Sequence, residues 1–216
     1  MAINQSDSSL KQLLHGGVDP ISDPAQRSDA GHLGMVLFLI SLAMVFATVV
    51  LAYVVVGLQL AQADDWRPAG APGLPTILIL STIVLLGSSV TLSLASRSAA
   101  RGGSASEVGR WMLLTLCLVA GFLITQGIAW VDLVEKDLLF QSSLYAWLFY
   151  VLTGVHALHV LGGIAPLCIV TRNAFKGCYS TKRFSRRGLI YCGMYWHFID
   201  VAWLILYLTL FWGMGG

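Results

Sequence analysis

Histidine and carboxylate side chains inside long apolar runs are the residues of this sequence that could do chemistry. His156 and His159 lie in G-V-H-A-L-H-V-L-G-G, and His197 and Asp200 lie in Y-W-H-F-I-D-V-A-W. Two residues three positions apart in a helix lie on neighbouring parts of one face, so each pair presents two polar groups in one direction. Gln126 adds an amide to another apolar run. Because ionisable groups inside a membrane are costly and usually functional, these positions are the candidate site.

Several kinds of site could use these side chains. A haem needs imidazoles from two facing helices, and His156 or His159 could pair with His197 in this way. Two histidines three residues apart on one helix cannot both reach one iron through a porphyrin, however. A tetrahedral metal site would need the three histidines and Asp200 to converge, which their spacing does not require. A proton relay, contact with a lipid headgroup and hydrogen bonding between helices are the remaining alternatives.

Depth in the membrane favours hydrogen bonding between helices. Counting about 1.5 Å per residue along two antiparallel helices places Asp200 within a turn of His159. A histidine and a carboxylate that bond each other satisfy two groups that would otherwise cost several kcal/mol in hydrocarbon. We therefore expect a His159 to Asp200 hydrogen bond between two helices, with the small residues Gly154, Ala157, Gly162 and Gly163 allowing close approach.

Transmembrane helices are the elements that must position these residues. Of 216 residues, 56% are hydrophobic and 11% are charged, and the mean hydropathy is +0.75, whereas soluble domains are roughly one quarter charged. A span needs about 20 mainly apolar residues. The sequence has five such runs, at 33–58, 74–96, 111–133, 144–171 and 189–212. We therefore expect an all-α polytopic membrane protein, a bundle of five transmembrane helices.

The charges between the runs predict the topology. Arginine and lysine gather after the second and fourth runs, at 97–110 and 172–187, and are scarce in the other two connections. The positive-inside rule then places the N-terminus in the cytoplasm and the C-terminus in the periplasm. We divide the chain into a polar cytoplasmic N-terminal tail, 1–30, and a five-helix domain, 31–216. Beside a membrane, the basic clusters indicate topology and anionic lipid and no nucleic-acid binding.

Local signals predict the connections and the helix ends. Three prolines make 63–75 an irregular turn. The polar segment 101–107 is expected to be a flexible hinge, in which Ser104 or Ser106 could cap the third helix. Aromatic residues that open the last two helices are expected to be interfacial anchors: Tyr145, Trp147, Tyr150, Tyr191, Tyr195 and Trp196. The ladder of Trp196, Trp203 and Tyr207 could instead pack against another helix or an acyl chain.

Several motifs together resemble a known family. The stretch T-G-V-H-A-L-H-V-L-G-G resembles the T-G-x-H-G-x-H-V-x-x-G motif of cytochrome c oxidase subunit III, and Y-W-H-F-I-D-V-A-W is similar to the motif of its closing helix. H-L-G-M-V-L-F-L-I-S, D-W-R-P-A-G-A-P-G-L-P and Gln126 agree, so the resemblance covers about 31–212. Where the family commonly has glutamate after the first-helix serine and three residues after the third-helix glutamine, this chain has Leu42 and Ala129.

The resemblance implies the short five-helix form of subunit III in a haem-copper terminal oxidase of a bacterial inner membrane. Such a subunit does no redox chemistry and binds no cofactor, because haems and copper belong to subunits I and II. It packs on subunit I, binds phospholipid, and supports stability and proton uptake during reduction of oxygen to water. The absent acids at Leu42 and Ala129 weaken the case for a proton relay through this chain.

On this reading six motif residues have structural or lipid-facing roles: Gln126, His156, His159, Trp196, His197 and Asp200. Subunit III of a quinol oxidase and an accessory protein of nitric oxide reductase would share the resemblance. Two alternatives come from other classes. A stand-alone haem-binding membrane reductase would use the histidines, and a small transporter would bind a coupling ion with His197 and Asp200.

Overall fold

Five helices make up the computed structural model, which describes residues 24–61, 73, 75–138, 143–179 and 186–213. They are α2 (Pro24–Ala61), α3 (Ile77–Ala100), α4 (Ala105–Glu135), α5 (Leu144–Phe175) and α6 (Arg187–Gly213), and the described part of the chain holds no strand. Each is long and apolar enough to cross a membrane. The predicted all-helical fold with five spans is confirmed. The cytoplasmic and periplasmic placement of the termini stays a prediction, as does the division at residue 30.

Each helix continues past the C-terminal end of its apolar run, because a helix satisfies its own backbone groups and can continue into polar residues. Helix α3 begins at Ile77, three residues after the start of its predicted run. The Ser104 side chain accepts a hydrogen bond from the backbone N–H of Glu107 (3.2 Å), so the predicted cap is confirmed. Ser143 caps α5 in the same way, by accepting from Ala146 N–H (3.1 Å).

The predicted loops differ from the structure in extent. The hinge expected at 101–107 is too long, since only 101–104 separates α3 from α4. That short turn is closed by a hydrogen bond from Gly103 N–H to the carbonyl of Ser98 (2.9 Å). Residues 1–23 of the predicted tail lie outside the described residues, as do 62–72 and 74, which form most of the predicted irregular turn.

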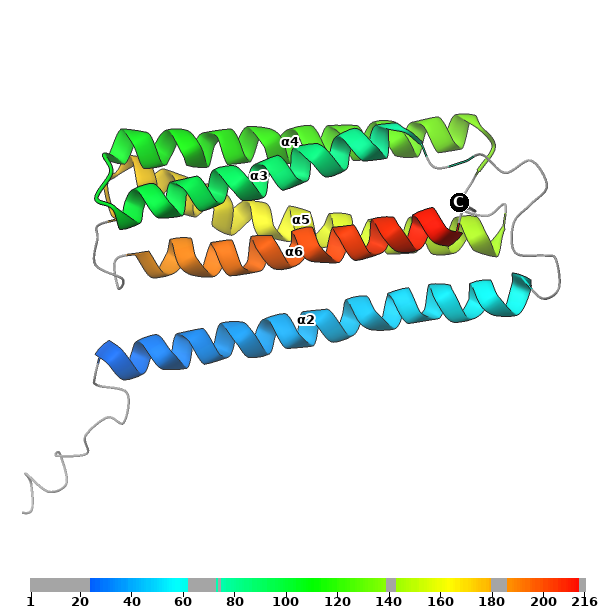
Figure 1. Ribbon diagram of the computed structural model, residues 1–216, viewed down its shortest axis with the longest axis horizontal. Coiled ribbons are helices and arrows are strands. Elements are labelled where there is room, and N and C mark those ends of the chain that lie inside the picture. The colour runs from blue at the N-terminus through cyan, green and yellow to red at the C-terminus, as the bar shows by residue number, and fades with distance from the viewer. Residues whose placement is uncertain (1–23, 62–72, 74, 139–142, 180–185, 214–216) are drawn as a thin grey trace, which may run out of the picture. The chain divides into compact units, whose positions relative to one another are not determined.

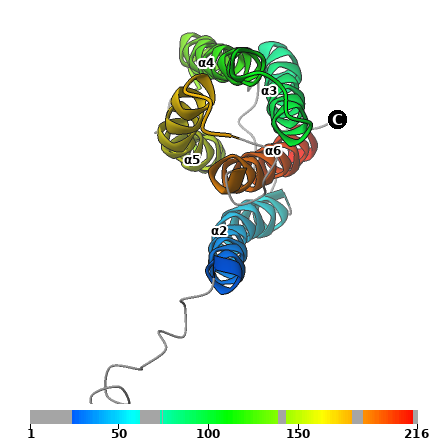
Figure 2. The ribbon, with the colours of Figure 1, turned by 90° about the vertical axis from the view of Figure 1, so that its left-hand side faces the viewer.

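Contacts divide the chain into two units, one ending at Phe38 and the other beginning at Leu39. In the first unit the described residues, 24–38, are helical. In the second unit α3, α4, α5 and α6 form a closed ring in which each helix packs against two neighbours, α3 against α4 and α6, and α5 against the same two (Figures 1 and 2). Large side chains that are almost fully buried fill its core, including Leu85, Phe122, Phe149, Trp196 and Trp203.

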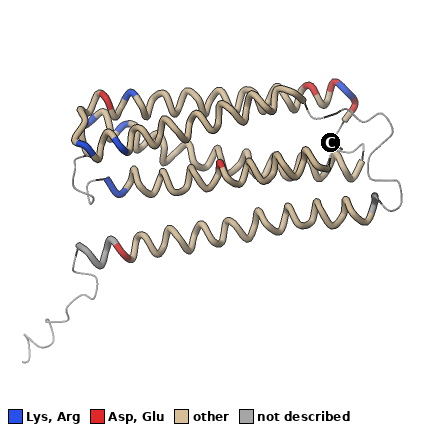
Figure 3. Tube along the Cα trace, in the orientation of Figure 1, with Lys and Arg blue, Asp and Glu red and all other residues tan. Residues whose placement is uncertain are grey.

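The charged residues that the structure describes in the second unit lie near the helix ends, with one exception (Figure 3). Basic residues gather where α3 and α5 end and α4 and α6 begin, as with Arg97, Arg172 and Arg187. The opposite end carries Asp132 and Lys136, whose side chains form an ion pair at 2.7 Å. The exception is Asp200, a buried acid in the middle of α6. The carboxyl group of Asp200 is therefore far from the water at both ends of the bundle.

Candidate functional site

The six candidate residues do not form one site. Gln126, His156, Trp196 and Asp200 are buried, His159 is half-buried, and His197 is exposed. They come from three helices, α4, α5 and α6. Each of them has different neighbours.

His156 is packed as an aromatic residue. Its side chain is 1% exposed, and its ring centroid lies 5.0 Å from that of Trp203 and 6.0 Å from that of Phe122. Phe46 of α2 lies at 6.1 Å. Neither ring nitrogen has a hydrogen-bond partner in the described part of the chain. His156 therefore joins α2, α4, α5 and α6 through ring contacts.

His159 does not meet Asp200, and the predicted hydrogen bond between them is wrong. Nδ1 of His159 lies 2.7 Å from the carbonyl of Val155 in its own helix. Its ring faces Phe46, with centroids 5.0 Å apart. Neither carboxyl oxygen of Asp200 has a hydrogen-bond partner among the described residues. Counting residues gave the two side chains a similar depth but could not give the rotation of each helix about its own axis.

Tyr195 makes the hydrogen bond between α5 and α6 that was expected of Asp200. Its hydroxyl donates to the backbone carbonyl of His159 over 2.8 Å. The helices approach closely at Gly163, where a Cβ atom would lie 2.7 Å from the Tyr195 ring and 3.0 Å from the Trp196 ring. At Gly162 the nearest atom would be 4.0 Å away. At Gly154, too, the nearest atom would be 4.0 Å away, so of the three glycines expected to allow close approach Gly163 is the one that does so.

His197 faces α3, where it contacts two serines. Its Nδ1 lies within hydrogen-bond distance of Ser89 Oγ, and its Nε2 lies 3.3 Å from Ser93 Oγ. A carboxyl oxygen of Asp200 is 3.9 Å from Nδ1. The motif histidine and aspartate of α6 therefore belong to one group of polar side chains with two residues of α3.

Small hydroxyl side chains of α3 accept hydrogen bonds from the large residues of α6. The indole N–H of Trp196 donates to Ser88 Oγ over 2.9 Å, and that of Trp203 donates to Thr82 Oγ1 over 3.0 Å. The prediction that Trp203 packs against another helix is confirmed. A buried indole needs an acceptor, and these hydroxyls supply it without widening the space between the helices.

The same face of α3 also contacts α4. Gln126 donates through Nε2 to Ser81 Oγ over 3.1 Å, and the hydroxyls of Thr91 and Thr115 lie 2.8 Å apart. The sequence interpretation overlooked these acceptors. Ser81 and Ser88 are seven residues apart in an otherwise apolar run, which is two helical turns, and this spacing was the available signal.

The expected interfacial anchors divide into two kinds. Trp147 is 42% exposed at the start of α5, which suits a membrane interface. Tyr145 and Trp196 are fully buried, so for these two residues the expectation is wrong. The sequence shows that an aromatic residue lies near the start of a helix, but only the packing of the helices decides whether its side chain faces lipid or the core.

No three histidine, cysteine, aspartate or glutamate side chains come together as a metal-binding group in the described ranges. The geometry of the polar residues is that of side chains joining helices: donors on one helix meet hydroxyls or carbonyls on the next. This arrangement can hold four spans in register and exclude solvent from the core.

A sequence profile of cytochrome c oxidase subunit III matches residues 25–214. The chain belongs to this family. It is therefore a haem-copper oxidase subunit III and a multi-pass membrane protein, one part of a complex with other oxidase subunits. The family resemblance seen in the two motifs is confirmed.

Curated relatives agree with the family. Cytochrome c oxidase subunit 3 of Corynebacterium diphtheriae is 32% identical over 186 residues, which cover 86% of this chain and 89% of the relative. Probable cytochrome c oxidase subunit 3 of Nocardia farcinica is 28% identical over 211 residues, 97% of each chain. Cytochrome c oxidase subunit 3 of Synechocystis is 31% identical over 185 residues, 85% of this chain and 76% of the relative.

The two positions at which this subunit III lacks an expected acid both lie in the interior. Leu42 is 7% exposed and Ala129 is 0% exposed. An apolar side chain at these positions packs without a partner, whereas a carboxyl group would need one. Gln126, three residues before Ala129, is satisfied by Ser81.

Proposed function

We propose that this chain is the non-redox accessory subunit of a bacterial haem-copper terminal oxidase, that it packs on subunit I of a complex that also holds subunit II, and that it resides in the inner membrane. The observation that carries the proposal is the family match over nearly the whole chain. The described interior supports it, since Trp196, Trp203 and Gln126 use their polar atoms to join helices. In this role the subunit keeps the oxidase stable while oxygen is reduced to water.

Cytochrome c is the electron donor that the names of the relatives favour. A quinol oxidase and the accessory protein of nitric oxide reductase are the alternatives, because the donor site belongs to another subunit. We propose that the chain supports proton uptake by packing on subunit I. Leu42 and Ala129 are buried and apolar where the family commonly has acids, which argues against proton transfer through this chain.

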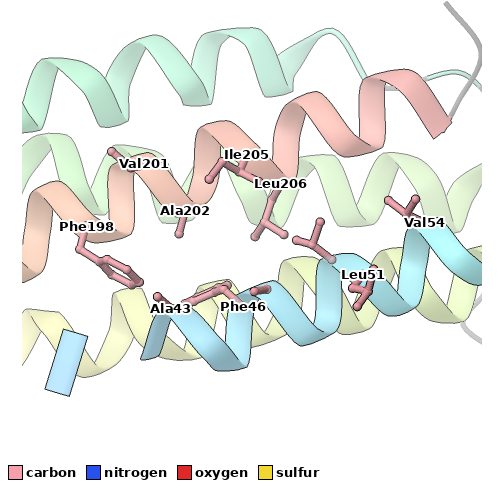
Figure 4. Close-up of a pocket in the computed structure, with 11 residues that line it drawn as sticks. Ala43, Phe46, Leu51, Val54, Phe198, Val201, Ala202, Ile205 and Leu206 are labelled. Carbon is pink, nitrogen blue, oxygen red and sulfur yellow. The ribbon is translucent and has the colours of Figure 1, made fainter. Parts of the chain in front are cut away.

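Phospholipid binding is proposed at an apolar groove between α2 and α6 (Figure 4). The groove has a volume of about 480 Å³. Phe46, Ala47 and Leu51 line it on α2, and Phe198 and Ile205 line it on α6. All its lining side chains are apolar. An acyl chain would therefore fill the groove through packing alone, because the groove presents no polar group to it.

Purification of the tagged chain in mild detergent from its native membrane tests the assignment. The expected result is co-purification with the two larger oxidase subunits, with a haem absorption spectrum and with oxygen reduction on addition of reduced cytochrome c. Activity with a quinol in place of cytochrome c would support the first alternative. A chain that purifies alone and without colour would contradict the proposal.

Filling the groove tests the lipid proposal. Ala47→Trp should displace an acyl chain and lower the phospholipid retained per complex, as measured by native mass spectrometry. Met44→Trp is the matched control, since Met44 is 66% exposed on the same helix and does not line the groove. Equal phospholipid retention in both variants would contradict a binding site here.

A further inference from the structure

Four polar side chains form a cluster on the outer side of the α3 and α6 contact, which we name the α3–α6 polar cluster: Ser89, Ser93, His197 and Asp200. The two ring nitrogens of His197 contact the two serine hydroxyls, Nδ1 to Ser89 and Nε2 to Ser93 at 3.3 Å. Asp200 lies behind the ring, with a carboxyl oxygen 3.9 Å from Nδ1.

The cluster lies in the middle of the spans. His197 comes ten residues after Arg187, the first residue of α6, which at about 1.5 Å per residue is about 15 Å along the helix. Ser89 comes eleven residues before Ala100, the last residue of α3, or about 16 Å. Since the hydrocarbon core is about 30 Å thick, the cluster is near the bilayer centre and beyond the reach of lipid headgroups.

His197 is exposed at this depth. Its side chain is 48% accessible, and that of Asp200 is 5% accessible. The other exposed side chains along the middle of α3, α4, α5 and α6, within the ranges the structure describes, are apolar, cysteine, proline or glycine. An imidazole facing acyl chains would be costly, because polar groups inside a membrane usually face protein or a water-filled cavity.

The cluster is not arranged for nucleophilic catalysis. In a Ser-His-Asp triad the carboxylate orients the ring nitrogen that faces away from the serine. Here Asp200 approaches Nδ1, the nitrogen that already contacts Ser89. The cluster therefore joins α3 and α6 through polar contacts.

Hydrogen-bonding capacity remains on the exposed side of the cluster. The two ring nitrogens of His197 contact one serine hydroxyl each. Each hydroxyl oxygen has two lone pairs and can accept a further bond. An acyl chain offers no donor, whereas a polar side chain of a neighbouring helix does.

The residues that follow His197 on α6 have the spacing of a helix-packing seam. Val201, Leu204 and Leu208 come four, seven and eleven residues after it, the alternation of four and three that lets one helix pack along another. Val201, which lies at the edge shared with the groove between α2 and α6, is 55% exposed, and Leu208, which does not line that groove, is 59% exposed. A helix lying along this seam would cover both leucines and reach the imidazole.

We propose that the α3–α6 polar cluster is the docking site for a transmembrane helix of another oxidase subunit, one that presents a hydroxyl or carboxamide side chain at the centre of the bilayer. The proposal rests on the proposed function as an accessory subunit. The partner side chain donates to a serine hydroxyl, and its helix packs along the seam from His197 to Leu208. A hydroxyl or carboxamide is specified because the groups that it would contact, the hydroxyls of Ser89 and Ser93, are uncharged.

A photo-crosslinking residue in place of Leu208 tests the docking site in native membranes. Leu158 is the matched control, a leucine of α5 that is 69% exposed and away from the cluster. The expected result is a crosslink from position 208 to a transmembrane segment of a larger oxidase subunit, and lipid adducts from position 158. Lipid adducts alone at 208, in a complex that still co-purifies, would overturn the docking site and leave the proposed function intact. Failure of any oxidase subunit to co-purify would overturn both.

Substitution of His197 tests the cluster, because its imidazole contacts both serine hydroxyls to which the partner side chain would donate. His197→Leu should make the partner subunits dissociate about tenfold more readily in a detergent wash, the loss expected for a strong hydrogen bond between membrane helices. His197→Gln keeps a donor and an acceptor and should retain most of the association. If the leucine variant does not accumulate, Ser93→Ala gives the same comparison with a smaller change. Association unchanged in the leucine variant would show that acyl chains cover the cluster.

Discussion

Helix α6 and the second half of α2 pack against the same core in different ways. On α6 ten residues are buried, and both of its buried tryptophans hydrogen-bond to α3. Along residues 39–59 of α2 only Leu42, Phe46 and Tyr53 are buried. Phe46 contacts His156, His159 and Phe198 through rings. Helix α6 therefore buries many more residues in the core than this part of α2, which buries three large side chains.

The difference shows how a membrane protein can fix some spans and leave others adjustable. Between helices in lipid, association depends on packing and on hydrogen bonds, because burial from water no longer drives it. A helix joined at several hydroxyls cannot slide or rotate without losing bonds. A helix held by a few apolar side chains leaves grooves, such as the one between Ala43 and Val201, that lipid can fill.

Trp203→Ala is expected to have the largest effect, because it removes a fully buried ring from the α6 side of the comparison. The indole packs against His156 and Phe122 and donates to Thr82. The loss should be about 3–5 kcal/mol in the free energy of unfolding, measured by thermal unfolding in detergent. Trp212→Ala is the control, since Trp212 is 85% exposed on the same helix. Equal effects in the two variants would contradict the packing described.

Phe46→Ala tests the α2 side of the comparison. It should cost about 3 kcal/mol, at the low end for a buried phenylalanine, and the loss should be local to α2. Hydrogen exchange would rise along residues 39–61 with little change along 189–210. Met44→Ala, at an exposed position on the same helix, should leave exchange unchanged. Faster exchange throughout α6 in the Phe46 variant would show that the two helices are held as one unit.

Gly163→Ala sharpens the comparison at the α5 and α6 contact. The added Cβ would lie 2.7 Å from Tyr195 and 3.0 Å from Trp196, so the rings must move. Overpacking of this kind costs about 1–3 kcal/mol. The neighbouring Gly162→Ala meets nothing closer than 4.0 Å and should be neutral. Thermal unfolding of the two variants measures the difference in stability. Equal stabilities would mean that the rings of Tyr195 and Trp196 can move aside at no cost.

The smallest expected effect isolates one hydrogen bond between α3 and α6. A double-mutant cycle of Ser88→Ala and Trp196→Phe should give a coupling of about 0.6–1.7 kcal/mol, the range for membrane helix pairs. Thr48→Ala is the control, because its hydroxyl donates to the carbonyl of Met44 in its own helix. A coupling energy near zero would show that packing alone, and not this hydrogen bond, holds α6 against α3.

Sequence patterns predicted the elements of this protein better than their contacts. Five apolar runs gave five spans, and a cap was predicted at Ser104 or Ser106, of which Ser104 is the cap, because capping depends on a residue and its immediate neighbours. The motif around His156 and His197 gave the family. The hydrogen bond proposed between His159 and Asp200 was wrong, since depth was the only coordinate that counting supplied. The acceptors on α3 were missed because Ser88 and Thr82 look like ordinary small residues in an apolar run.

Hydropathy and local pattern, which the sequence holds by itself, determined that the chain crosses a membrane five times and which positions carry polar groups at mid-depth. Tertiary structure decided the partner of each group. It turned His156 toward aromatic rings, His197 toward two serines at the surface, and Tyr195 toward a carbonyl of α5. The physical reason is that a helical period fixes a residue's face relative to its own helix, while the rotation of that helix is set by the packing of all its neighbours together.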